Sequence, residues 1–191
     1  MENIFDAEIN YIHEERIRKS AKKLVGMLPD YFFEVAASST GKYHPKVSNL
    51  EGGLVNHTKI AVRFAKELFN NGILFNSYTE HDQDMIILAL IMHDGFKHGL
   101  NHEKYVRFDH PIISAEFVKE HAIEVGLTDD EGNLLYDLIS SHMGIFNTSN
   151  YSKVVLPLPK TNMQKFVHLC DDLASKKFLD LEFDENHTLL N

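Results

Sequence analysis

The sequence predicts an all-α protein that forms a single domain of 191 residues. Three observations lead to this fold class. Apolar residues recur three or four positions apart through most of the chain, as they do along the buried face of an amphipathic helix. Two threonines are each followed, three residues later, by a side chain that completes a capping box. The segments between the apolar runs are polar and rich in glycine or proline, which is typical of loops.

We expect six helices, the first of which packs on a core formed by residues 50–180. The helices cover residues 6–28, 54–70, 82–93, 111–125, 129–142 and 161–178, and the longer loops cover residues 36–53, 95–109 and 145–160. The 82–93 helix is apolar on all sides, so it should lie at the centre of the domain.

Residues with known positional preferences mark the helix ends. Pro111 suits the first turn of the fourth helix, and Gly126 closes that helix. The pairs Thr128–Glu131 and Thr161–Gln164 match the capping box that begins a helix.

Composition excludes several classes of protein. The net charge of -9 opposes strong non-specific binding to nucleic acid, which depends on lysine and arginine. The single cysteine, Cys170, rules out an internal disulfide and suits a reducing cytoplasm. The first residues, MENIFDAEIN, have no basic start or apolar core, so we expect no secretory signal. The longest apolar run is too short to span a bilayer.

Four histidines and two aspartates fall at inward positions of the expected helices or at their ends. His57 extends the apolar stripe of Ile60 and Phe64, because residues three and four apart share a helix face. Asp171 falls within the apolar stripe of its helix, whereas Asp172 lies about 100° away on a more polar face. The six residues are His57, His93, Asp94, His110, His142 and Asp171.

Such a set favours a metal site. One inward histidine is more often a hydrogen-bonded core residue than a ligand, but six such residues on five helices are a different case. Buried charges are usually paired or bound to metal, and no excess of inward lysine or arginine is present to pair these carboxylates. Imidazole and carboxylate ligands without thiolate suit Fe, Mn, Co, Ni or Zn, and Mg less well.

The order of these residues and their flanking segments resemble the HD-domain superfamily of metal-dependent phosphohydrolases over roughly residues 50–180. EGGLVNH resembles the start of the helix with the first ligand, and HDGFKHG resembles the His-Asp-x-x-Lys signature. SSHMG and HLCDDLASKK resemble the late histidine and aspartate segments. The chain is most similar to the HD region of YhaM-like 3′–5′ exoribonucleases and to small stand-alone HD hydrolases of bacteria and phages. The resemblance implies a single HD-domain helical bundle over residues 1–191.

The resemblance also implies a site for two divalent transition metals per chain, with Fe, Mn, Co or Ni favoured over Mg or Zn. The ligands of the first metal would be His57, His93, Asp94 and Asp171, and those of the second would be His110 and His142, with Asp94 shared. Lys97 matches the signature lysine and should face the phosphate of the substrate. Lys42 and His44 are further candidates for substrate binding, although the segment around them fits the family pattern more loosely.

The function implied is hydrolysis of a phosphate ester in a nucleotide or short oligonucleotide by a metal-activated water, with Asp94 and Lys97 as catalytic residues. The negative charge favours a small phosphorylated substrate over long RNA. Three alternatives stay open: a 3′–5′ exonuclease on single strands, a di-iron oxygenase, and a non-catalytic module that binds a nucleotide. We expect a cytoplasmic enzyme that binds no membrane, and the sequence predicts no oligomeric state.

Overall fold

The computed structural model describes residues 4–71, 77–182, 184, 185 and 189, and its described part is all-α, as the sequence predicts. The α-helices of this part are α1 (Asp6–Ile9), α2 (Glu15–Val25), α3 (Gly53–Asn70), α4 (Glu80–Met92), α5 (His110–Val125), α6 (Asp129–Ser140) and α7 (Asn162–Ala174). Short 3-10 turns, η1 (Asp30–Phe33), η2 (Lys46–Ser48) and η3 (Lys177–Asp180), lie in the connections. No helix within the described ranges is long and apolar enough to cross a membrane.

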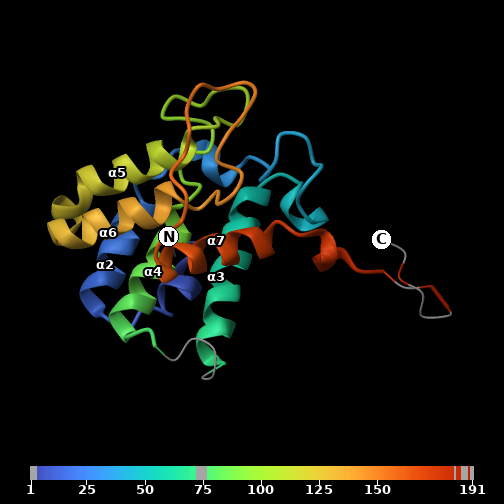
Figure 1. The fold of residues 1–191 in the computed structure, drawn as a ribbon. Coiled ribbons are helices and arrows are strands. Elements are labelled where there is room, and N and C mark those ends of the chain that lie inside the picture. The colour runs from blue at the N-terminus through green and yellow to red at the C-terminus, as the bar shows by residue number, and fades with distance from the viewer. Residues whose placement is uncertain (1–3, 72–76, 183, 186–188, 190–191) are drawn as a thin grey trace.

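Helix α4 is the central helix of the bundle. It runs between α2, α5 and α6 on one side and α3 and α7 on the other (Figure 1). Every residue from Asp84 to Gly99 is buried, which explains why this helix is apolar all round. Helix α4 therefore ends inside the domain, where neighbouring elements can reach the side chains of His93 and Asp94 from several directions.

One sequence prediction is wrong at the N-terminus: residues 6–28 do not form one helix. The chain breaks between α1 and α2, and Asp84 of α4 explains the break. Its carboxylate accepts the backbone N–H groups of His13 at 2.7 Å and Glu14 at 2.9 Å, together with the His13 ring at 2.8 Å. Asp84 thereby satisfies N–H groups at the start of α2 from across the core. The single charge within the apolar run DMIILALIM thus has a structural partner.

Capping boxes begin three of the helices. The predicted boxes Thr128–Glu131 and Thr161–Gln164 are confirmed at α6 and α7, and a third, Thr79–Asp82, begins α4. The predicted ends are less accurate. Helix α6 stops at Ser140 and not at residue 142, and α7 stops at Ala174 and not at residue 178. The first of these two differences affects the site, because it places His142 in a turn beyond the helix.

Candidate metal centre

The six predicted side chains converge at one place, and they do so because each lies at or near the end of a helix or one turn inside it. His57 lies in the second turn of α3, and His93 and Asp94 follow the last residue of α4. His110 is the first residue of α5. His142 lies in the turn after α6, and Asp171 lies in the last turn of α7. Five segments distant in sequence thus supply the cluster.

Potential ligand atoms of these residues form three overlapping groups, in each of which all atoms lie within 4.8 Å of one another. The groups are His57 with His93 and Asp94, His93 with His142 and Asp171, and Asp94 with His110 and His142. The resemblance implies a first half of His57, His93, Asp94 and Asp171 and a second half of His110 and His142 with Asp94 shared. The first group contains three residues of the first half, and the third group contains the whole second half. The remaining group joins Asp171 and His93 to His142, so the two halves are in direct contact. These buried groups could hold metal ions.

Asp94 lies between the two halves and turns one oxygen toward each. Its Oδ1 is 2.9 Å from Nε2 of His110 and 3.7 Å from Nε2 of His142. Its Oδ2 is 3.4 Å from Nε2 of His93 and 3.7 Å from Nε2 of His57. Asp94 could therefore contribute one oxygen to each half.

Asp171 lies beside His57 and His93. Its Oδ1 lies 2.9 Å from Nε2 of His57 and 3.5 Å from Nε2 of His93. The neighbouring Asp172 instead pairs with Lys176, one turn further along α7, at 2.7 Å. The helix phase expected from the sequence is therefore the one observed.

Backbone carbonyl groups orient three of the four imidazole rings in the same way. In His93, His110 and His142, Nδ1 lies 2.6, 2.6 and 2.7 Å from the carbonyl oxygen of the residue three positions earlier. A carbonyl can only accept, so each Nδ1 donates its proton, and each neutral ring keeps a lone pair on Nε2. The carbonyl groups therefore select the tautomer that offers Nε2 to a metal.

The charge of the cluster is balanced by neighbouring cations. Burial opposes ionisation of Asp94 and Asp171, but the cationic and hydrogen-bonding groups around them hold the pKa of both carboxyl groups well below the usual range. Burial also opposes the charged form of His93, yet Asp94 and Asp171 outweigh it and raise the pKa of this ring to about 10. Burial lowers the pKa of His142 to about 3, so that ring is neutral. A divalent cation would replace the proton on His93.

Buried atoms without partners provide a test of whether a metal fits. Oδ1 of Asp94, Nε2 of His110 and Nδ1 of His57 are all buried and have no hydrogen-bond partner. Buried polar atoms usually have one, and two of these three are ligand atoms of the same half. Together with a donor set of imidazole and carboxylate, they fit a divalent transition metal.

Lys97 and His44 border the cluster, whereas Lys42 does not. The ammonium group of Lys97, a buried residue, lies 2.5 Å from Oδ2 of Asp94. The His44 ring packs edge-on against His57, with 4.9 Å between centroids. Burial, with Lys97 and His57 nearby, lowers the pKa of His44 to about 3. Lys42 lies on the exposed loop with its ammonium over the Tyr43 ring, and none of its described contacts reaches the six residues.

Sequence reasoning missed several residues that support the cluster. Tyr31 of η1 donates its hydroxyl proton to the carbonyl of Gly99 at 2.7 Å, and burial is the main reason that its pKa rises to about 12. His168 of α7 lies 2.7 Å from the carbonyl oxygen of His142. Both contacts join side chains to backbone atoms distant in sequence, so no local pattern predicts them.

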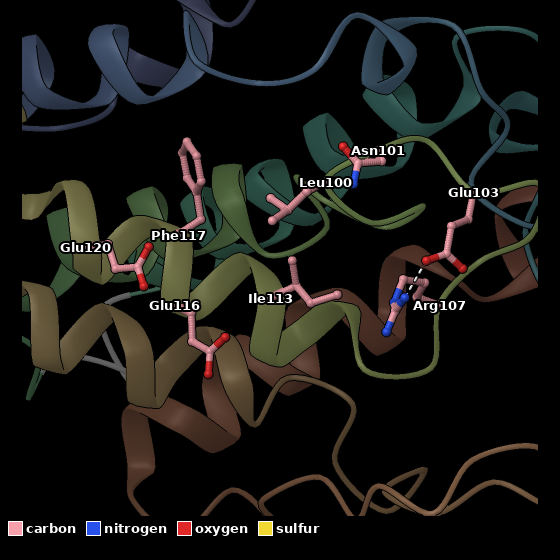
Figure 2. Close-up of a pocket in the computed structure, with 8 residues that line it drawn as sticks. All are labelled: Leu100, Asn101, Glu103, Arg107, Ile113, Glu116, Phe117 and Glu120. Atoms are coloured by element: carbon pink, nitrogen blue, oxygen red, sulfur yellow. Dashed lines mark hydrogen bonds and ion pairs between the residues drawn. The ribbon is translucent and has the colours of Figure 1, made fainter.

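A hollow of about 340 Å³ lies beside the second half and contains none of the six residues. Figure 2 shows it between the loop that precedes α5 and the first turns of that helix. Arg107 lines it and pairs with Glu103 and Asp109, while its carbonyl oxygen accepts the Nδ1 proton of His110. Its other charged lining residues are acidic: Glu103, Glu116 and Glu120. The hollow is therefore ill suited to a phosphate group.

Comparison with known families, with curated proteins and with solved structures finds no match to this chain. The assignment of a function therefore depends on the geometry and chemistry of the cluster.

Proposed function

We propose that the protein is a metal-dependent phosphohydrolase of the HD type that acts on a nucleotide or short oligonucleotide. The observation that carries this proposal is the ammonium group of Lys97 beside Asp94, within the cluster of potential metal ligands. Lysine is rarely buried, and a point charge beside the potential metal ligands could bind a phosphate oxygen of a substrate.

The residues in and around the cluster would have different roles in the reaction. Asp94 spans the two halves and would fix their separation. Two divalent ions held there, most suitably Fe, Mn, Co or Ni, would lower the pKa of a water and neutralise charge on the phosphoryl group. Lys97 would bind a phosphoryl oxygen, and the neutral His44 ring would offer a hydrogen-bonding group on the His57 side of the cluster. Lys42 is the least supported of the proposed substrate contacts, because it lies on the exposed loop.

The size of the substrate follows from the charge of the chain. A net charge of -9 repels a long polyanion, whereas Lys97 can still attract one phosphate group locally. A small substrate is also consistent with a cluster enclosed by five helical segments. We place the activity in the cytoplasm, where the unpaired Cys170 would stay reduced.

The test is a panel of nucleotides and di- to tetranucleotides incubated with protein loaded with Mn²⁺, Fe²⁺, Co²⁺ or Ni²⁺, with released phosphate or nucleotide measured. Asp94→Asn is the matched inactive variant, because it keeps the shape of the side chain and removes its charge. We expect metal-dependent turnover that Asp94→Asn abolishes. No turnover by any loaded form, or equal turnover by the variant, would contradict the proposal. Consumption of dioxygen by the Fe-loaded form would favour the oxygenase alternative.

A further inference from the structure

His168 links α7, which carries Asp171, to the turn after α6, which carries His142. It lies on α7, three residues before Asp171, and it is not one of the six potential ligands. Its Nδ1 lies 2.7 Å from the carbonyl oxygen of His142, so the ring donates its proton to that oxygen. The residue whose carbonyl it holds is itself a potential ligand of the second half.

The backbone beside His142 is shaped to accept this ring. Gly144 has a φ of +56°, and a Cβ atom placed on it would lie 2.2 Å from the His168 ring. Only glycine allows the ring to lie this close to the turn. The His168 ring therefore contacts the 141–144 turn at two places. It donates a hydrogen bond to the carbonyl oxygen of His142, and it packs directly against Gly144.

A second contact joins α7 to α6 one turn earlier. The Nε2 group of Gln164 on α7 donates to the carbonyl oxygen of Asp137 on α6 at 3.1 Å. Gln164 and His168 are four residues apart, so they lie on one face of α7. This face holds the end of α6 at two points, and Asp171 lies on the same helix one turn further along.

We infer that His168 is a positioning residue for the second metal half. Because α6 ends at Ser140, no helical hydrogen bond of α6 fixes the carbonyl of His142. His168 supplies that constraint, and it sets the position of the His142 ring relative to Asp171 and Asp94. The inference depends on the proposed metal centre, and it adds a residue that acts on metal affinity through His142.

The test is calorimetric titration of the metal-stripped full chain with Co²⁺. In His168→Phe the ring is kept and the donor is lost, whereas in His168→Asn the amide N–H lies close to the place of Nδ1. Wild type should bind two equivalents. In His168→Phe one of the two affinities should fall on the order of 10–100-fold, as is typical when a supporting partner is removed, while the other stays unchanged. His168→Asn should restore two tight equivalents.

His121 provides matched controls. It is also half-buried, its Nδ1 lies 2.8 Å from the carbonyl oxygen of Phe117, and it stacks on the Phe117 ring away from the cluster. His121→Phe and His121→Asn should bind Co²⁺ as wild type does. Unchanged binding by His168→Phe, or equal weakening of both equivalents, would overturn the inference while leaving the metal centre intact. Failure of His168→Asn to restore binding would also overturn it, and wild type that binds no metal would overturn both proposals.

Discussion

The Nε2 atom of His110 lies 2.9 Å from Oδ1 of Asp94, and neither atom has a hydrogen-bond partner. The proton of the His110 ring is engaged at Nδ1 by the carbonyl of Arg107, at 2.6 Å. In the neutral ring, the Nε2 lone pair therefore faces a buried carboxylate oxygen. A metal ion bound between the two atoms would accept both lone pairs.

The adjacent aspartates on α7 give the first prediction. Asp171→Ala should lower metal content and abolish turnover, because Oδ1 of Asp171 lies within 3.5 Å of two imidazole nitrogens. Asp172→Ala should keep the metal and the activity of wild type, because it loses only a partly exposed pair with Lys176, worth about 0.2–0.5 kcal/mol. Elemental analysis and turnover measurements on both variants show which of the two aspartates binds the metal. The reverse pattern would mean that the metal is held elsewhere.

The second prediction concerns Lys97. Lys97→Ala should reduce kcat/KM on phosphorylated substrates by about 1.5–3 kcal/mol of transition-state stabilisation, which is roughly 10–100-fold. Metal content should not fall, because the lysine competes for the oxygen of Asp94 that would face a metal. Lys104→Ala is the control, since Lys104 is exposed and its ammonium lies over Tyr105. Equal kinetics for the two variants would remove Lys97 from the site.

The third prediction concerns the stability of the fold at low pH, which we expect to depend on the pair between Arg16 and Glu131. Glu131 is buried and receives hydrogen bonds from Arg16 at 2.6 and 2.9 Å, which lower its pKa to about 2. A lowered pKa stabilises the fold above the ordinary value of 4.5, and this contribution is lost as the pH falls from there toward 2. Glu131→Gln keeps a residue suited to the capping box and removes the charge. At pH 7 it should be less stable by about 1–2 kcal/mol, since Arg16 is partly exposed.

Thermal unfolding of both proteins in EDTA, at a series of pH values from 7 down to 3, measures this difference. The gap between wild type and Glu131→Gln should narrow once the pH drops below about 4.5. A gap that stays constant over this range would show that the Arg16 pair contributes no pH-dependent stability.

The fourth prediction concerns substrate length. With a net charge of -9, the protein should hydrolyse mononucleotides or very short oligonucleotides and bind long RNA weakly. A gel-shift assay and a time course of digestion with a single strand of about thirty nucleotides measure both properties. Tight binding, or stepwise shortening of the strand, would instead favour the exonuclease alternative and would require a local basic channel.

Local patterns predicted the helices and the phase of their inward faces well, because periodicity and capping act over a few residues. They predicted that His57 and Asp171 point inward, and the structure brings these side chains to 2.9 Å. They failed where contacts between distant segments decide the outcome. The break before α2 depends on Asp84, some 70 residues away, and the position of His142 depends on His168.

The C-terminal ends of α6 and α7 also differ from the prediction. His142 continues the apolar stripe of Leu138 and Ile139, so the sequence predicted a helix through residue 142. The structure instead ends α6 at Ser140 and places the His168 ring against Gly144. The Thr79–Asp82 box, in contrast, is local and was missed only because aspartate replaces the usual glutamate or glutamine.

The central claim is that Asp94 joins two metal ions, and the metal content of wild type and Asp94→Asn tests it most directly. Both proteins would be expressed in medium supplemented with Mn or Fe, purified without chelator, and analysed for metal per chain. We predict about two transition-metal ions per wild-type chain and a loss from both halves in Asp94→Asn, because one oxygen of Asp94 faces each half. A wild-type content near zero that does not rise on reconstitution, or a variant that retains two ions, would contradict the claim.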